Sequence, residues 1–132
     1  MLRWGWLNRL LGNRGERIAA RYLSRQGYRI LARQARNKVG EIDLIAQDGS
    51  TIVFIEVKTR SSTQKGHPHE AVDRAKQRQL TRTALAWLKQ RGLLEVRCRF
   101  DVVSIVWHAG SPPEIMHYKN AFEATGHDTL FS

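Results

Sequence analysis

The segment from residue 40 to residue 60, GEIDLIAQDGSTIVFIEVKTR, constrains the fold more than any other part of the chain. Two apolar runs rich in β-branched residues, 42–46 and 51–57, flank the polar tetrapeptide QDGS. β-branched residues favour strands, and a short polar segment with a glycine between two such runs is typical of a hairpin turn. We therefore expect an antiparallel β-hairpin over this segment.

Three charged residues interrupt these apolar runs: Asp43 in the first run, and Glu56 and Lys58 near the end of the second. Successive side chains of a strand point to opposite faces, so Glu56 and Lys58 share one face. A turn with an even number of residues would place Asp43 on that face as well, with the Cβ atoms within roughly 5 to 8 Å of one another. A turn with an odd number of residues would separate Asp43 from the other two.

Two carboxylates and an ammonium in an apolar hairpin are costly to bury unless a further interaction compensates for their lost hydration. A divalent cation would do so, because hard Mg²⁺ prefers carboxylate oxygens and retains waters that can attack a phosphodiester. Lys58 would then orient or deprotonate such a water, or neutralise charge that develops on the phosphate. The simpler alternative is a salt bridge between Glu56 and either Lys58 or Arg60, with Asp43 exposed to solvent.

The motif GEID at residues 40–43, followed by EVKTR at residues 56–60, resembles the core motif of the PD-(D/E)xK nuclease superfamily. It resembles in particular the YraN-like family of small bacterial endonuclease-like proteins, and it is also similar to the archaeal Holliday-junction resolvases. The resemblance extends over roughly residues 12 to 122. One position departs from the superfamily pattern, because Ile42 stands where a proline is expected before the aspartate.

The resemblance implies a restriction-endonuclease-like core and an Mg²⁺- or Mn²⁺-dependent endonuclease that cleaves DNA. It implies that Asp43, Glu56 and the main-chain carbonyl of Val57 hold the cation. It further implies that Lys58 positions or activates the attacking water, and that Glu16 is an accessory ligand from the first helix.

The position of Glu16 in the first predicted helix allows a second, structural role for this residue. Asn13 is a candidate N-cap of a helix that ends at Gly27, and Glu16 is the third residue after it, as in a capping box. A capping-box glutamate satisfies a main-chain N–H at the helix start, whereas the family resemblance makes Glu16 a metal ligand. The two roles remain open.

The remaining patterns predict one more helix and several strands. Alternating residues at 28–33 indicate an edge strand, and the polar residues 59–68 indicate a loop. A long helix is expected from residue 68 to about residue 91, followed by strands at 96–107 and 114–118. Together these elements predict a single α/β domain with a mixed sheet of four to five strands flanked by helices.

Two residues of the predicted strand 96–107 have structural interpretations. Asp101 is expected to pair with Arg97 or Arg99. Cys98 is expected to be a buried small apolar residue, and as the single cysteine it cannot form an intramolecular disulfide. This cysteine content predicts a cytoplasmic protein.

The charge balance predicts a polyanionic partner. The chain has 22 lysines and arginines against 12 acidic residues, a net charge of +10. Nucleic acid is the first candidate, with DNA favoured and RNA an alternative, an anionic membrane surface is the second, and solubility alone is the simplest explanation. The basic residues that we expect to contact nucleic acid are Arg33, Arg36, Lys38, Arg60, Lys65 and Lys76.

The 132-residue chain is expected to form one domain over residues 13–122, with a basic, Trp-rich tail at 1–12 and a second tail at 123–132. No segment has the apolar length of a membrane span. The predicted function is therefore a metal-dependent DNA endonuclease, which could act on branched or structured DNA as a homodimer. The alternatives are a nuclease-like protein that binds nucleic acid without cutting it, and a membrane-surface protein.

Overall fold

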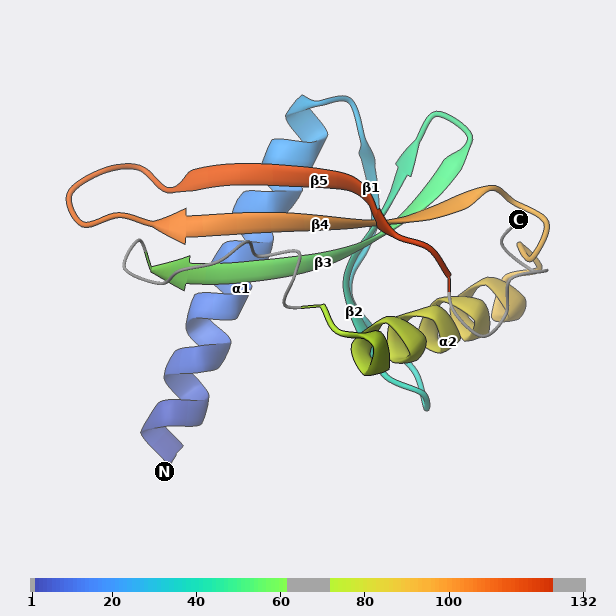
Figure 1. The fold of residues 1–132 in the computed structure, drawn as a ribbon, viewed down its shortest axis with the longest axis horizontal. Helices are drawn as coiled ribbons and strands as arrows, with labels where there is room; N and C mark the ends of the chain where they lie inside the picture. Colours follow the sequence, from blue (N-terminus) through green and yellow to red (C-terminus); the bar gives the residue numbers. More distant parts are fainter. Residues whose placement is uncertain (1, 62–71, 125–132) are drawn as a thin grey trace.

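The computed structural model describes the backbone of residues 2–61 and 72–124, and the side chains of residues 13–61 and 72–124. It forms one α/β domain with a mixed five-stranded sheet and two helices, as the sequence predicts (Figure 1). The elements are α1 (Leu2–Arg25), β1 (Arg29–Arg36), β2 (Glu41–Asp48), β3 (Thr51–Ser61), α2 (Arg74–Gln90), β4 (Cys98–Trp107) and β5 (Glu114–Phe122).

The strands lie in the order β1-β2-β3-β4-β5, so β1 is an edge strand, as predicted. The β3–β4 pair is parallel, and the other three neighbouring pairs are antiparallel. A parallel pair needs a crossover connection, and the segment containing α2 provides it. The described helices include none with the length and apolarity needed to cross a bilayer.

The two helices cover opposite faces of the sheet. Side chains of α2, among them Leu80 and Trp87, pack with Phe54 of β3 in one apolar cluster. Side chains of α1, among them Leu23, pack with Val53 of β3 in the other cluster. Because alternate residues of β3 and β4 face different helices, both strands are buried on both sides, which explains their nearly continuous apolar sequence.

The central hairpin has the even-length turn that brings Asp43 and Glu56 together. Asp48 pairs with Thr51, so the turn contains two residues, Gly49 and Ser50. The pairing of β2 with β3 ends at Leu44 and Ile55, while β2 stays paired with β1 down to Glu41. The two strands of the hairpin therefore diverge at Asp43, and Figure 1 shows β2 curving away from β3 beyond this point.

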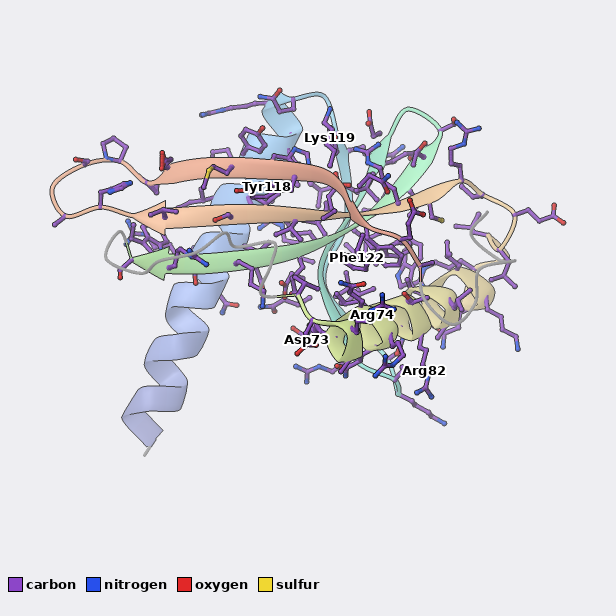
Figure 2. All side chains as sticks on the ribbon, in the orientation of Figure 1. Asp73, Arg74, Arg82, Tyr118, Lys119 and Phe122 are labelled. Carbon is purple, nitrogen blue, oxygen red and sulfur yellow. The ribbon has the colours of Figure 1, made fainter. Side chains whose placement is uncertain are left out.

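Both helices begin at residues other than the predicted ones. Helix α1 begins at Leu2, so Asn13 lies inside it and the prediction of a capping box with Glu16 is wrong. The leucines and arginines before Asn13 have good helix propensity, which lets the helix continue through that residue. Helix α2 begins at Arg74 after Asp73, both labelled in Figure 2. The Asp73 side chain accepts a hydrogen bond from the Lys76 N–H at 2.8 Å.

The helix start predicted at Pro68 lies outside the described residues, and within them α2 begins directly after its N-cap Asp73. Strand β3 continues to Ser61, past the predicted loop start at residue 59, because it stays paired with β4 up to Trp107. Strand β5 is longer than predicted and ends at Phe122, whose ring stacks on Phe100 at a centroid distance of 4.9 Å.

The connection between β1 and β2 packs tightly against α2. The Asn37 amide donates a hydrogen bond to the Thr83 carbonyl at 3.1 Å. A Cβ atom at Gly40 would lie only 2.8 Å from the Thr83 hydroxyl oxygen, so this close approach requires glycine. The contact fixes the start of β2, and with it the acidic residues that follow.

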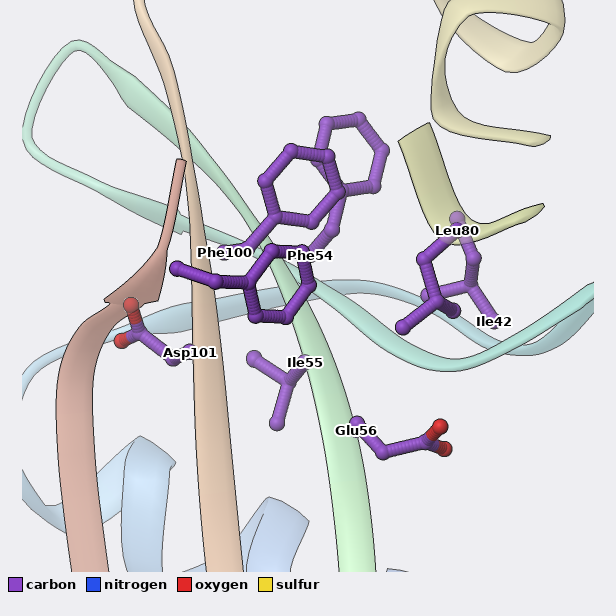
Figure 3. Close-up of a pocket in the computed structure, with 8 residues that line it drawn as sticks. Ile42, Phe54, Ile55, Glu56, Leu80, Phe100 and Asp101 are labelled. Carbon is purple, nitrogen blue, oxygen red and sulfur yellow. The ribbon is translucent and has the colours of Figure 1, made fainter. Parts of the chain in front are cut away.

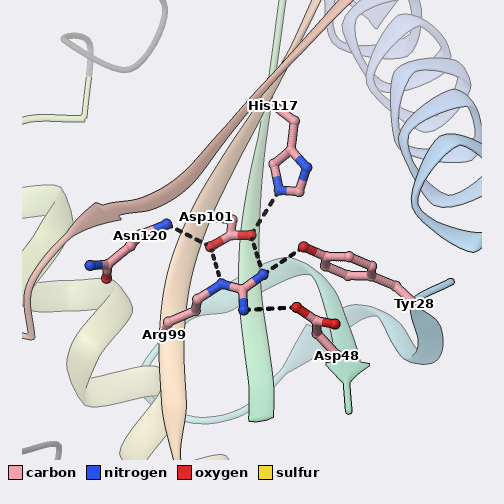
Figure 4. Close-up of polar contacts among 6 residues, drawn as sticks. All are labelled: Tyr28, Asp48, Arg99, Asp101, His117 and Asn120. Carbon is pink, nitrogen blue, oxygen red and sulfur yellow. Dashed lines mark hydrogen bonds and ion pairs between the residues drawn. The ribbon is translucent and has the colours of Figure 1, made fainter. Parts of the chain in front are cut away.

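A buried polar network ties β4 to β5. The Asp101 side chain is fully buried, and its oxygens lie 3.0 Å from Arg99 Nε, 2.8 Å from His117 Nε2 and 2.9 Å from the Asn120 N–H (Figure 4). The expected pairing with Arg99 is confirmed. Arg99 also donates hydrogen bonds to Asp48 and Tyr28.

The hydrogen-bond partners of Asp101 lower its pKa by more than its burial raises it. Burial by itself raises the pKa of this carboxyl, but hydrogen bonds from His117, Arg99 and the Asn120 N–H hold it below its ordinary value near 3.8. A carboxyl whose pKa is lowered in the folded state stabilises the fold above its ordinary pKa and loses that contribution as the pH falls.

We expect Asp101→Asn to lower the free energy of unfolding at pH 7 by about 3 kcal/mol, because it removes the buried charge that Arg99 and His117 share. The loss should shrink as the pH falls below about 4, because the unfolded wild-type chain then gains a proton at Asp101 that the folded state takes up only at lower pH. Urea denaturation at pH 7 and pH 3 measures both effects. The exposed Glu123→Gln serves as control, and an Asp101→Asn protein with wild-type stability at pH 7 would contradict this role.

Candidate metal centre

Four carboxyl groups from three elements gather where β2 leaves β3. Glu41 and Asp43 come from β2, Glu56 from β3 and Glu16 from α1. Glu16, Glu41 and Asp43 each offer one oxygen atom within 4.8 Å of the others. Asp43 lies close enough to both Glu56 and Glu16 for their charges to raise its pKa. Asp43 is therefore at the centre of the cluster.

The strand divergence explains how Asp43 reaches this position. One of its carboxyl oxygens, Oδ2, accepts a hydrogen bond from the Val57 N–H at 2.8 Å. The carboxyl group thus satisfies a β3 main-chain donor at the point where the pairing with β2 has ended. This contact fixes Asp43 beside Glu56.

The surroundings of Asp43 favour its protonated form. Burial raises the pKa of Asp43 to about 9, and the hydrogen bond with Glu56 and the Glu56 charge contribute in the same direction. Burial also raises the pKa of Glu16, although hydrogen bonds with Gln34 and Asp43 oppose that shift. The Asp43 proton stabilises the fold fully below the ordinary pKa near 3.8, and this contribution is lost as the pH rises through about 9.

Glu56 has an oxygen that lacks a hydrogen-bond donor in the described part of the chain. Its side chain is only 8% exposed, and Oε2 lies 3.3 Å from the Lys76 Nζ. This distance is that of an ion pair, but the ammonium is not aligned to donate a hydrogen bond to Oε2. Figure 3 shows Glu56 beside the apolar side chains of Ile42 and Leu80, with its carboxylate turned away from the Phe54 ring.

These observations fit a bound divalent cation. The donor atoms of the cluster are all carboxylate oxygens, which suits hard cations and lacks the nitrogen and sulfur ligands typical of zinc. A cation at this position would replace the Asp43 proton as the positive charge between the carboxylates. It could also bind Glu56 Oε2, the oxygen that accepts no hydrogen bond from a described residue. The acidic cluster can therefore hold a metal ion.

The structure brings together part of the predicted site. Asp43, Glu56 and Glu16 meet, as the even-length turn and the family resemblance predicted. Val57 contributes its N–H to Asp43, while the role of its carbonyl as a ligand stays a prediction. Lys58 is half-buried two residues beyond Glu56 and takes part in none of the ion pairs between described residues.

The predicted nucleic-acid contacts lie at different distances from the cluster. Arg33 lines an open pocket of about 330 Å³ together with Glu16, and Arg36 pairs with Glu41 at 2.6 Å. Lys76 pairs with Glu56 as described above. Lys38 is exposed in the β1–β2 connection, Arg60 lies in β3, and Lys65 lies outside the described residues.

Sequence reasoning missed two residues of the site. Glu41 belongs to the GEID motif and shares a strand with Asp43, so the sequence placed it near the site, but no ligand role was predicted for it. Gln34 carried no such signal. It lies between the β1 residues that pair with Leu44 and Ile42, has a left-handed backbone with φ of 49°, and lies close enough to Glu16 to lower the pKa of that carboxyl.

The fold and the carboxylate cluster define a small α/β protein with a candidate metal centre. The model of a family described as "Uncharacterised protein family UPF0102" matches residues 15–105, a segment that contains all four carboxylates. The chain is 50% identical over 116 residues to a UPF0102 protein of Geobacter sulfurreducens, covering 88% of this chain and 91% of the relative.

It is also 45% identical over 128 residues to a UPF0102 protein of Rhodopirellula baltica, covering 94% of this chain and 77% of the relative. A UPF0102 protein of Chlorobium phaeobacteroides is 47% identical over 120 residues, covering 87% of this chain and 94% of the relative. The chain belongs to the UPF0102 family. This finding confirms the YraN-like assignment at the level of the family.

We expect cation binding to compete with the Asp43 proton. Because the pKa of Asp43 is about 9 without a cation, binding of Mn²⁺ at pH 7 should release about one proton, and affinity should rise about tenfold per pH unit between about pH 6 and pH 8. Calorimetric titrations in buffers of different ionisation enthalpy measure both quantities. Asp43→Asn should bind weakly with a flatter pH profile, whereas a pH-independent wild-type affinity would contradict the proton competition.

Proposed function

We propose that this chain is a metal-dependent endonuclease that hydrolyses phosphodiester bonds in DNA and belongs to the PD-(D/E)xK nuclease superfamily. The observation that carries the proposal is the half-buried Asp43 beside the buried Glu56 at a strand divergence, with Lys58 two residues further along β3. This order of acidic and basic residues matches the superfamily motif, and the mixed sheet between two helices suits its core.

The proposed cofactor is Mg²⁺ or Mn²⁺, held by Asp43 and Glu56 with the Val57 carbonyl, while Glu16 and Glu41 lie close enough to bind it or its waters. When bound, such a cation stabilises charge on a phosphoryl oxygen and lowers the pKa of a coordinated water. The protein contributes the fixed geometry, because Asp43 is anchored to the Val57 N–H and Glu56 is buried.

Lys58 is the proposed catalytic lysine. It shares the face of β3 that carries Glu56, since residues two apart in a strand point the same way. Its ammonium would orient the attacking water or stabilise charge that develops on the scissile phosphate. With no described carboxylate paired to it, the Lys58 side chain does not need to break an ion pair before meeting a phosphate.

The substrate proposal rests on charge and on the surroundings of Glu16. A net charge of +10 raises the local concentration of a polyanion and strengthens its binding at low salt. Arg17 and Arg33 line the same open pocket as Glu16, where guanidinium groups can hold the backbone phosphates of a strand that enters the site. Symmetric cutting of a four-way junction would require two copies of the chain.

We expect the wild-type protein to cut labelled DNA in Mg²⁺ or Mn²⁺ and not in EDTA, and Asp43→Ala and Lys58→Ala to lose activity by about 100-fold or more. The assay should compare linear, flap and four-way-junction DNAs with matched RNAs. The exposed Lys89→Ala controls for a general loss of positive charge. Salt-sensitive binding without cutting would contradict the proposal and would favour a nucleic-acid-binding protein with a nuclease-like fold.

A further inference from the structure

The buried Glu56 carboxylate receives its counter-charge from α2. The Lys76 Nζ lies 3.3 Å from Glu56 Oε2, and the side chains are 38% and 8% exposed, respectively. The neighbouring carboxyl groups of Asp43 and Glu16 add no positive charge to this side of the cluster. Among the described ion pairs, the one with Lys76 is the only one that Glu56 makes.

The local structure of α2 positions Lys76 for this contact. Asp73 caps the helix by accepting a hydrogen bond from the Lys76 N–H at 2.8 Å, which fixes the Lys76 backbone in the first turn. Leu80, one turn further along, lines the same apolar pocket as Glu56. Residues four apart share one face of a helix, so Lys76 also faces the strand that carries Glu56.

The ion pair between Lys76 and Glu56 can be separated without moving the backbone. The ammonium is within ion-pair distance of Oε2 but is not aligned for a hydrogen bond, so the pair is held by charge alone. More than a third of the Lys76 side chain is exposed, and its flexible four-carbon stem can turn the ammonium toward solvent while the backbone stays fixed.

We propose that Lys76 is the internal counter-ion of Glu56 in the cation-free protein, and that a divalent cation and the Lys76 ammonium compete for this carboxylate. The inference rests on the proposed function, because it concerns the same metal centre. A dication beside Glu56 repels an ammonium a few ångströms away, so binding of the cation expels the Lys76 side chain. Lys76 and Lys58 then have different tasks, the first as counter-ion and the second as catalytic lysine.

Displacement of Lys76 would couple cation binding to nucleic-acid binding. In the cation-free protein the ammonium is occupied by Glu56. Once released, it becomes available to a backbone phosphate at the start of α2, which adds about one phosphate contact to the complex. Binding of the cation thus fills the metal centre and, by releasing Lys76, increases the affinity for the nucleic acid.

The test compares Lys76→Gln and Lys76→Arg with the control Lys89→Gln, which removes an exposed lysine in the last turn of the same helix. Calorimetry measures Mn²⁺ affinity, and thermal unfolding in EDTA measures the stability of the cation-free protein. Lys76→Gln should bind Mn²⁺ at least about five-fold tighter and unfold at a lower temperature in EDTA, because it removes a partly buried counter-ion. Lys76→Arg should stay near wild type, and Lys89→Gln should change neither quantity.

A second measurement separates a counter-ion from a permanent phosphate contact. Binding of a short duplex DNA is followed against salt concentration, once in EDTA and once with Ca²⁺ as the cation. Lys76→Gln should reduce the slope of log affinity against log salt by about 0.9 with Ca²⁺ and leave it unchanged in EDTA. A reduced slope in EDTA, or unchanged or weaker Mn²⁺ binding by Lys76→Gln, would overturn the inference.

These outcomes also distinguish the inference from the proposed function. If the wild-type protein binds Mn²⁺ and cuts DNA while Lys76→Gln binds Mn²⁺ with wild-type affinity, the counter-ion role of Lys76 is wrong and the nuclease proposal stands. If the wild-type protein binds no divalent cation, the proposed function fails, and the counter-ion inference fails with it.

Discussion

The hydrogen bond from the Val57 N–H to Asp43 is the interaction on which the candidate site depends. It exists because β2 leaves β3 after the pair of Leu44 and Ile55, so that a β3 donor is free for a side chain. A two-residue turn sets the register that brings Asp43 to this point, and the close packing of Gly40 on α2 fixes the start of β2. The turn geometry and the helix packing thus together place the Asp43 carboxyl group beside Glu56.

The buried Asp101 and the half-buried Asp43 show how surroundings separate structural from chemical roles. Asp101 is surrounded by donors and a guanidinium, which hold its pKa below the ordinary value even though it is fully buried. Asp43 has carboxyl neighbours, and its burial together with Glu56 raises its pKa to about 9. A group kept in an unfavourable ionisation environment is the one expected to change state when a ligand binds, which points to Asp43 and away from Asp101.

Much of the fold could be predicted from local patterns, and the site only in part. The hairpin and the proximity of Asp43 and Glu56 follow from strand periodicity and an even-length turn. The helix starts were predicted wrongly because good helix formers before Asn13 extend α1 through that residue, and because the Asp73 cap sets the start of α2. Lys76 carried a signal for phosphate contact, but its pairing with Glu56 depends on how α2 lies on the sheet. Glu16 was implicated through family resemblance alone.

Anomalous diffraction from crystals of the protein grown with Mn²⁺ would locate the cation directly. We expect one strong anomalous peak between the Asp43 and Glu56 carboxylates, with metal–oxygen distances of about 2 Å, and the Lys76 ammonium moved away from Glu56. Absence of a peak at the point where β2 leaves β3 would contradict the metal centre. So would a peak only elsewhere with the Glu56–Lys76 ion pair intact.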